Sequence, residues 1–452
     1  MSHAFVDPAR TDRFRVIGGA GATAIVVASM VGSGVFSLTG QFGATVGGDA
    51  GVLAPWVIGG VLALCGGLSL AELGAMIPCS GGSIEFARRA FGARIGYLVA
   101  MVTILSGYLL SLAAVGLFLA EFVDRLAPGA LDLRATAAIA LVLAFLSQAF
   151  GLRMGFAIST ALAAVKIGFV AFFAVAGLLV EPAAPRLVAA AAPGAADAPA
   201  AGLLSSAVAQ ATLMVSFAYL GWSTAADIAG DVRRPGRNVP LAIVAAIGIV
   251  FVLYLGTNLA YLRAIEPAAM TAPDGGPMPA IGSVAAGILF GETAGRAMTA
   301  VIALLLFSTM VSGTITAARI LESMAHAGEV PAWLEPRRAN GVPMRGLVVT
   351  TVAALASLAI GSLGEILGLL TVLVNVFSAL SVAAVLVLRR RMPDAPRPFR
   401  VPLFPLPPIV YLALAGWSVA ASAFDGGLRA VLASVGAVAV LLALRPLLAR
   451  RA

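Results

Sequence analysis

Two glycines that flank a serine are the first residues in this chain with chemistry to do. Gly32, Ser33 and Gly34 lie in the middle of a long apolar run. A glycine costs about 1 kcal/mol in a helix interior, so two of them need a physical reason. One reason is close packing of membrane helices through small residues. The other is an unwound stretch whose backbone N–H groups and half-helix dipoles face a ligand.

A second glycine, Gly221, lies among aromatic residues in a later apolar run. Phe217, Tyr219 and Trp222 surround it, and it follows Gly34 by 187 residues. Packing of the rings against neighbouring helices is one interpretation of this segment. A second helix break is the other, because interrupted helices at corresponding positions in two halves of a chain indicate a transport site.

Lys166 is the only lysine in the chain. It lies inside an apolar run, about ten residues or roughly 15 Å from the nearer end. An ammonium at mid-membrane costs about 2.5–3.5 kcal/mol on insertion scales, so an ionisable group there indicates a function. The other notable ionisable residues are Glu72, Asp227 and Asp231. The two aspartates lie one helical turn apart on one face.

Composition decides which elements must position these residues. Of 452 residues, 60% are hydrophobic and 11% are charged, whereas a soluble domain carries about 25% charged residues. The mean hydropathy is +1.02. These values exclude a water-soluble globular protein and a disordered chain. Two histidines and two cysteines leave little from which to build a metal cluster or a Ser-His-Asp triad.

Apolar runs of about 20 residues predict twelve membrane-spanning helices, because the runs are too long and too uniform for strands. The predicted spans are 15–38, 51–77, 96–123, 133–150, 156–180, 203–230, 241–262, 297–324, 346–362, 366–388, 406–422 and 428–447. The predicted fold class is therefore an all-α membrane protein.

The arginines orient these spans. With the N-terminus in the cytoplasm, 22 of the 28 arginines fall inside and six outside, as the positive-inside rule requires. An even number of spans then puts both termini in the cytoplasm. This explanation of the net charge of +8 removes the argument for a nucleic-acid partner. We expect no removed signal peptide, because no cleavage site follows a short apolar region. A short apolar stretch at 280–290 predicts a small surface helix.

Four groups of residues together resemble the amino acid–polyamine–organocation transporters, especially their bacterial and cationic or heteromeric amino-acid branches. They occur in the expected order over nearly the whole chain. The groups are Gly32-Ser33-Gly34-Val35-Phe36; Ala71-Glu72-Leu73 to Pro78 with Ser80-Gly81-Gly82 through Phe91-Gly92; Phe217 to Trp222 with Pro235, Arg237-Asn238 and Pro240-Leu241; and Arg319 through Gly328 and Pro331 with Pro396 to Pro402.

The resemblance implies a LeuT-like fold of two inverted five-helix repeats, with helices 1 and 6 broken, followed by two further helices. On this division, 1–14 is a cytoplasmic arm, 15–180 the first repeat, 181–202 an outside linker and 203–388 the second repeat. Residues 389–452 form a cytoplasmic loop, helices 11 and 12 and a short tail.

The resemblance also implies that an amino acid binds between the two breaks. Its carboxylate would meet N–H groups at the positive end of the second half of span 1, and its ammonium would meet unwound carbonyls. Phe217 matches an aromatic residue that closes over the substrate. The expected substrate-binding residues are Ala28, Val31, Gly32, Ser33, Gly34, Phe217, Ala218, Tyr219 and Gly221.

Lys166 resembles the span-5 lysine of sodium-independent relatives, in which an ammonium takes the place of a sodium ion. The resemblance implies that it ties span 5 to carbonyls of span 1 and to a hydroxyl of span 8, with Ser308 and Ser312 as the candidates. Proton exchange by this lysine and a permanently charged lysine in an exchanger are both open.

Asp231 matches the second of two acids in many relatives, whereas Gly230 stands in place of the first and departs from the pattern. We expect Asp231 to pair with Arg319 as an inner gate. An ion pair at the membrane edge without a gating role is the alternative. Asp227 has no counterpart to which a role can be carried over. Glu72 is expected to contact a cytoplasmic loop rather than the substrate.

The sequence therefore predicts a secondary transporter that moves amino acids across a bacterial cytoplasmic membrane by alternating access, without sodium, by proton coupling or amino-acid exchange. It predicts no enzyme activity, cofactor or metal. The expected partners are the amino acid, the lipid bilayer and, for coupled transport, protons. No disulfide-linked subunit is expected, because no cysteine lies on an outside loop. A non-transporting amino-acid sensor and a transporter of polyamines or other organic cations are the alternatives, and scattered ionisable residues disfavour a membrane enzyme or a channel.

Overall fold

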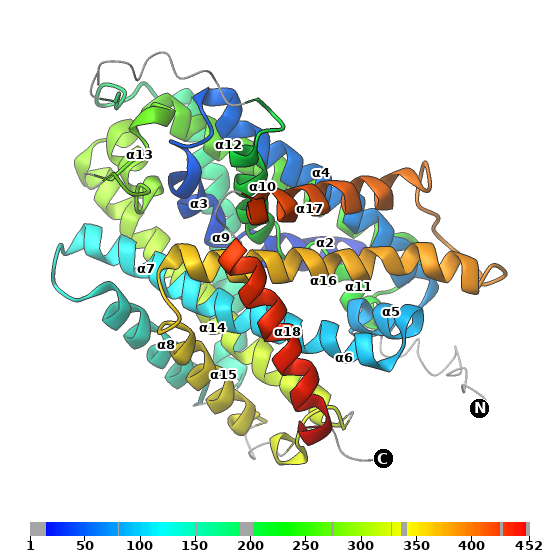
Figure 1. Ribbon diagram of the computed structural model, residues 1–452. Helices are drawn as coiled ribbons and strands as arrows, with labels where there is room; N and C mark the ends of the chain where they lie inside the picture. Colours follow the sequence, from blue (N-terminus) through cyan, green and yellow to red (C-terminus); the bar gives the residue numbers. More distant parts are fainter. Residues whose placement is uncertain are drawn as a thin grey trace.

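The regular elements of the described chain are all helices (Figure 1). The computed structural model describes residues 15–79, 81–149, 152–189, 202–272, 275–326, 328–335, 341–424 and 428–448. Within these ranges, extended backbone pairs only at three isolated bridges. The predicted all-α class is therefore confirmed for the described residues.

The first half of the chain contains one interrupted helix, several long helices and one short helix. In order they are α2 (Gly19–Met30), α3 (Gly34–Phe42), α4 (Gly48–Met76), α5 (Gly82–Phe91), α6 (Ala93–Val102), the π-helical stretch η2 (Thr103–Leu110), α7 (Ser111–Leu126), α8 (Leu133–Ala149) and α9 (Leu152–Leu179). The π-helical stretch was not predicted, because its composition matches that of the α-helices on either side.

The second half repeats this order of long and short helices. It contains α10 (Ser206–Ala218), α11 (Thr224–Asp227), α12 (Pro235–Ala264), α13 (Ile281–Phe290), α14 (Glu292–His326), α15 (Met344–Ser357) and α16 (Leu363–Arg391). Two further helices follow, α17 (Leu406–Ser422) and α18 (Leu428–Leu448). Each of the twelve predicted spans coincides with a helix or an interrupted pair, and α13 is the short helix predicted at 280–290. Among the residues that the structure describes in full, seven helical segments are long and apolar enough to cross a membrane.

The two short helices α5 and α13 share their details. Each follows a long helix, begins after a residue in the left-handed region and ends at a glycine with positive φ. The left-handed residues just before the helices are Gly81 and Ala280, and the glycines just after them are Gly92 (φ 92°) and Gly291 (φ 84°). In both cases the next long helix starts at once. The same local turn therefore connects the same order of elements in each half.

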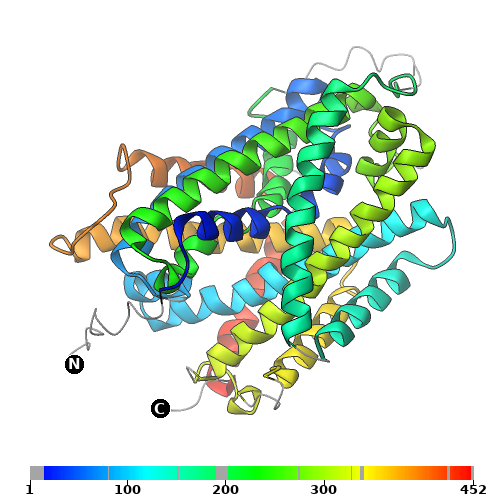
Figure 2. The same ribbon diagram turned by 180° about the vertical axis from the view of Figure 1, so that it is seen from behind.

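The helices form two groups, with close contacts inside each group. The first is formed by α2, α4, α10 and α12, and the second by α7, α8, α14 and α15, while α9 contacts members of both. Figure 2 shows α2 lying beside α12 and close to α9. In Figure 1, α16 runs across the molecule with α17 alongside it and α18 crossing it. The interrupted helices thus lie in one group and Lys166, on α9, lies between the groups.

Candidate functional site

Span 1 is interrupted where the two glycines predicted a possible break. Helix α2 ends at Met30 and α3 begins at Gly34. Val31 is extended, with φ −68° and ψ 101°, although its N–H still reaches the carbonyl of Val27 at 2.8 Å. The first N–H groups of α3 have no partner within that helix and form its positive end. The prediction of an unwound stretch is confirmed.

Span 6 is interrupted in the same way. Helix α10 ends at Ala218, and turns lead through Gly221 to the short helix α11. Gly221 has a φ of 109°, in a region that residues other than glycine rarely adopt. This backbone conformation, and not ring packing alone, explains the glycine among aromatic residues.

The two breaks lie against each other. A Cβ atom on Gly34 would lie 2.5 Å from the Cβ and 2.8 Å from the Cα of Ala218. A Cβ atom on Gly221 would lie 2.8 Å from the carbonyl carbon of Ser29. Both interpretations of the glycines therefore hold, since the residues permit the breaks and also allow close packing of the two interrupted helices.

Tyr254 of α12 hydrogen-bonds both broken helices, a role that the sequence analysis did not predict. Its hydroxyl lies 2.7 Å from the carbonyl oxygen of Met30 and 2.9 Å from that of Ala218, the last residues of α2 and α10. Carbonyls at helix ends lack partners within the helix, so one buried hydroxyl between them stabilises both ends. Tyr254 is one of two tyrosines in its apolar run, and residue type alone did not signal this role.

The side chains at the breaks divide into packed and unpartnered groups. Tyr219 is fully buried, its hydroxyl donates to the carbonyl of Trp56 at 3.0 Å, and its ring meets that of Tyr254 edge-on. Phe217 is also buried. The Ser33 hydroxyl is buried too, but it has no hydrogen-bond partner among the described residues. Tyr219 is therefore committed to packing, whereas Ser33 keeps its hydroxyl available at the positive end of α3.

Lys166 reaches span 8 through a residue that the sequence analysis did not choose. Its Nζ atom lies 3.1 Å from the Oγ1 atom of Thr309 on α14, and the lysine side chain is buried. The expected partners were Ser308 and Ser312, which share a helix face four residues apart, while the Ser312 hydroxyl donates to the Ser308 carbonyl at 3.1 Å. Thr309 lies about 100° around the helix from Ser308, on the side that meets α9. A hydroxyl of span 8 therefore binds Lys166, at Thr309, and contacts of the lysine with Ser308 and Ser312 stay predictions.

Asp231 and Arg319 are not joined by an ion pair in the part of the chain that the structure describes. Arg319 is exposed on α14, and the Asp231 carbonyl accepts the N–H of Ile17 at 3.1 Å. The Arg233 N–H donates back to the Ile17 carbonyl at 2.8 Å, so the segment before α2 pairs in parallel with the segment after α11. The gate formed by Asp231 and Arg319 stays a prediction.

Asp227, which had no assigned role, holds the start of α5. Its carboxylate accepts the backbone N–H of Ser83 at 2.9 Å and the hydroxyls of Ser83 and Ser223 at 2.6 and 2.9 Å. A carboxylate at a helix N-terminus is favoured by the helix dipole. Asp227 therefore connects span 6 to the short helix between spans 2 and 3.

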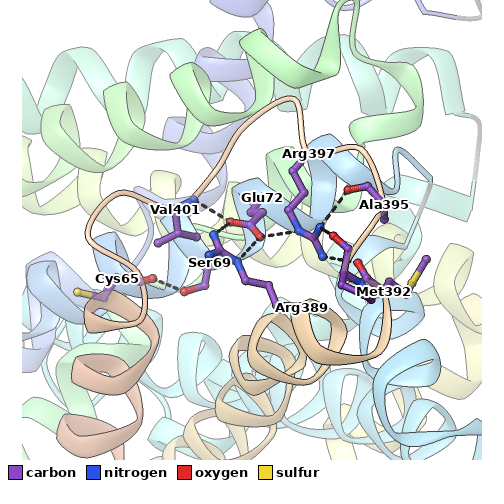
Figure 3. Close-up of polar contacts among 9 residues, drawn as sticks. Cys65, Ser69, Glu72, Arg389, Met392, Ala395, Arg397 and Val401 are labelled. Atoms are coloured by element: carbon purple, nitrogen blue, oxygen red, sulfur yellow. Dashed lines mark hydrogen bonds and ion pairs between the residues drawn. The ribbon is translucent and has the colours of Figure 1, made fainter.

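Glu72 of α4 is buried at the centre of a charge cluster that joins α4 to the end of α16 and the loop after it (Figure 3). Arg389 Nε donates to Oε1 of Glu72 at 2.8 Å, the second nitrogen of the same guanidinium donates to Oε2, and the Val401 N–H donates to Oε2 at 2.7 Å. Arg397 Nε lies 3.4 Å from Oε1, and its guanidinium also binds carbonyls of the loop, including that of Met392. The expected structural role of Glu72 is confirmed.

Cysteine and metal chemistry find no support among the described residues. No group of three or more His, Cys, Asp or Glu side chains there could hold a metal ion. Burial raises the pKa of the Cys79 thiol, between α4 and α5, to about 11, so this thiol carries little of the reactive thiolate.

Comparison with known proteins identifies the family. Residues 17–440 match the amino acid permease family. The chain belongs to that family. The mouse large neutral amino acids transporter small subunit 2 is 28% identical over 419 residues, which cover 88% of this chain and 74% of that protein. The serine/threonine exchanger SteT of Bacillus subtilis is 26% identical over 399 residues, or 87% of each chain. The mouse b(0,+)-type amino acid transporter 1 is 27% identical over 404 residues, or 86% of this chain and 78% of that protein.

Family membership explains the features described above. This permease is a multi-pass membrane protein of an amino-acid transporter family and not an enzyme. The resemblance to amino acid–polyamine–organocation transporters, inferred from four groups of residues, is confirmed.

Proposed function

We propose that this permease is a sodium-independent secondary transporter that exchanges amino acids, or couples their movement to protons, by alternating access. The observation that carries the proposal is the meeting of the two helix breaks. Gly34 and Ala218 bring the positive end of α3 beside the end of α10, and the unpartnered Ser33 hydroxyl lies at that end. An amino acid offers a carboxylate to this positive end and an ammonium to carbonyls. Exchange is favoured over proton coupling because the relative SteT is named a serine/threonine exchanger.

The sodium-independent part of the proposal rests on Lys166. A buried ammonium hydrogen-bonded to Thr309 supplies a fixed positive charge between the two helix groups. A sodium ion in the same position would be repelled by it. Both a permanently charged lysine and one that releases its proton in the cycle fit this arrangement.

The remaining architecture is proposed on the same basis. Twelve spans, two inverted repeats of five spans with the division at 181–202, and both termini in the cytoplasm of a bacterial inner membrane form one consistent scheme. The matching turns at α5 and α13 support the repeats, and the arginine distribution supports the orientation. We also propose that the permease works without a disulfide-linked subunit.

The test uses purified protein in liposomes loaded with a mixture of unlabelled amino acids. Uptake of a panel of radiolabelled amino acids is followed with and without sodium, with and without a pH gradient, and with and without the internal mixture. We expect uptake that is unchanged by sodium and stimulated by internal amino acids. Dependence on an inward proton gradient alone would select proton coupling. Absence of uptake together with thermal stabilisation by an amino acid would replace transport with sensing, and absence of both would point to polyamines or other organic cations.

A further inference from the structure

A second serine, Ser37, lies one turn beyond Ser33 on α3. Ser33 has helical dihedral angles (φ −69°, ψ −30°), so residues 33 and 37 are separated by one regular turn. Side chains four residues apart lie on the same helix face, about 6 Å apart along the axis. Ser33 is 2% exposed and Ser37 is 0% exposed. Neither hydroxyl has a hydrogen-bond partner among the described residues.

Among the described residues, the buried hydroxyls of Tyr97, Thr350 and Ser418 also lack a partner, but most buried hydroxyls have one. Buried hydroxyls on the other helices typically donate to the carbonyl four residues earlier. Ser69 donates to the Cys65 carbonyl, Ser106 to the Val102 carbonyl and Thr212 to the Val208 carbonyl, at 2.7–2.8 Å. Ser37 does not make the equivalent bond. A buried hydroxyl without a partner is unfavourable unless a ligand supplies one.

The other directions around α3 are each taken by a neighbouring helix. Gly34 meets Ala218 of α10, and the Phe36 ring lies 5.9 Å from that of Phe169 on α9. On the next face, Thr39 accepts the indole N–H of Trp56 at 3.1 Å. The face that carries Ser33 and Ser37 lies between those of Gly34 and Phe36, because successive residues turn by about 100°. The two hydroxyls on this face are the ones that have no hydrogen-bond partner among the described residues of α3.

We propose that Ser37 is a specificity-determining residue that hydrogen-bonds the side chain of the substrate, so that this permease prefers small neutral amino acids carrying a side-chain hydroxyl. This inference rests on the proposed function, because it takes the carboxylate of the amino acid to lie at Ser33. A ligand held there by its carboxylate presents its side chain within one helical turn, where Ser37 lies. The hydroxyl of Ser37 can donate to or accept from a substrate hydroxyl. An apolar side chain of the same shape leaves Ser37 unpartnered.

The magnitude follows from the asymmetry of hydrogen bonding. A site that hydrogen-bonds a substrate hydroxyl discriminates against an analogue that lacks it more strongly than an apolar pocket discriminates by size. For a single hydroxyl pair we expect about 10–100-fold tighter apparent affinity for threonine than for valine, which has nearly the same shape. The same preference is expected for serine over alanine.

The test compares Ser37→Ala and Ser37→Cys with the parent and with Ser418→Ala. Ser418 of α17 is a matched control, since its hydroxyl is also buried without a partner among the described residues. Uptake in liposomes is measured for serine, alanine, threonine and valine, each over a range of concentrations. We expect the parent and Ser418→Ala to prefer the hydroxylated member of each pair. Ser37→Ala should lose most of that preference while still transporting alanine, and Ser37→Cys should lie between.

Three results would overturn the assignment. The parent could transport amino acids without distinguishing the pairs, or Ser37→Ala could keep the preference. Equal weakening of all four substrates by Ser37→Ala would assign Ser37 to the common head group instead. Failure of the proposed function is distinct, because the parent would then transport none of the amino acids in the wider panel. Should Ser37→Ala not fold, the pattern in Ser37→Cys decides between these outcomes.

Discussion

Gly32 and Gly34 flank the same serine, yet an added methyl group would meet different surroundings at each. At Gly34 the new carbon would lie 2.5 Å from Ala218 Cβ and 2.8 Å from its Cα. Non-bonded carbon atoms prefer about 3.5–4.0 Å, so α3 and α10 would have to separate by about 1 Å. At Gly32 the nearest atom outside its immediate neighbours is the Met30 carbonyl oxygen, at 3.7 Å, which is ordinary contact.

Because of these distances, we expect one variant to affect helix packing and the other to affect substrate binding. Gly34→Ala should destabilise the folded protein by about 1–3 kcal/mol, the range of overpacking in a close-packed interior. Gly32→Ala should change stability by no more than about 0.5 kcal/mol. It places a methyl group directly at the break, however, so we expect apparent affinity for the transported amino acid to fall about tenfold or more, equivalent to about 1.4 kcal/mol.

The two variants are compared with the parent by thermal unfolding in detergent and by uptake in liposomes. Equal thermal stability of Gly34→Ala and the parent would mean that α3 and α10 are not in van der Waals contact at this point. Unchanged affinity in a well-folded Gly32→Ala would remove the break in span 1 from the substrate site.

Five further substitutions, two of them comparison variants, test the other described contacts. Lys166→Ala should reduce uptake at least about tenfold in folded protein. Thr309→Val should reduce uptake less, because the buried ammonium remains. Uptake by Lys166→Ala equal to that of the parent at every pH tested would exclude Lys166 from the mechanism. Tyr254→Phe should cost about 1–3 kcal/mol of stability, since two buried carbonyls lose their shared donor; thermal unfolding measures this, and no loss would show that the carbonyls need no partner. Glu72→Gln should cost about 3–5 kcal/mol, because the partly buried guanidinium of Arg389 loses its carboxylate. Glu85→Gln, at a more exposed ion pair, should cost less than about 1 kcal/mol. Similar thermal stabilities of the two variants would contradict the cluster.

The sequence predicted what depends on local chemistry and missed what depends on the contacts between helices. Hydrophobic length located the spans, and the glycines located both breaks, because these signals lie within one segment. Tyr254 and Thr309 were missed because their roles require knowledge of which helix faces meet. A single tyrosine or threonine in an apolar run carries no signal of that kind.

The acids illustrate the same boundary. Glu72 was expected to contact a cytoplasmic loop because it lies near the inner end of span 2, and position along one helix was enough. The partner of Asp227 lies 144 residues earlier in the chain, at Ser83, and no periodicity connects the two. Where pairing is set by tertiary packing, residue type alone leaves the partner open.

The cluster around Glu72 has a consequence for how the protein is made. Its partner Arg389 follows it by 317 residues. At a synthesis rate of about 5–20 residues per second, the carboxylate of span 2 therefore waits about 15–60 s before its arginine leaves the ribosome. An unpaired carboxylate is costly in lipid, so span 2 has reason to stay near the water-facing edge of the bilayer or beside the insertion machinery during that interval. Its final seating is a late event of biogenesis, and a chain truncated before residue 389 should remain accessible at Glu72 to water-soluble carboxyl reagents.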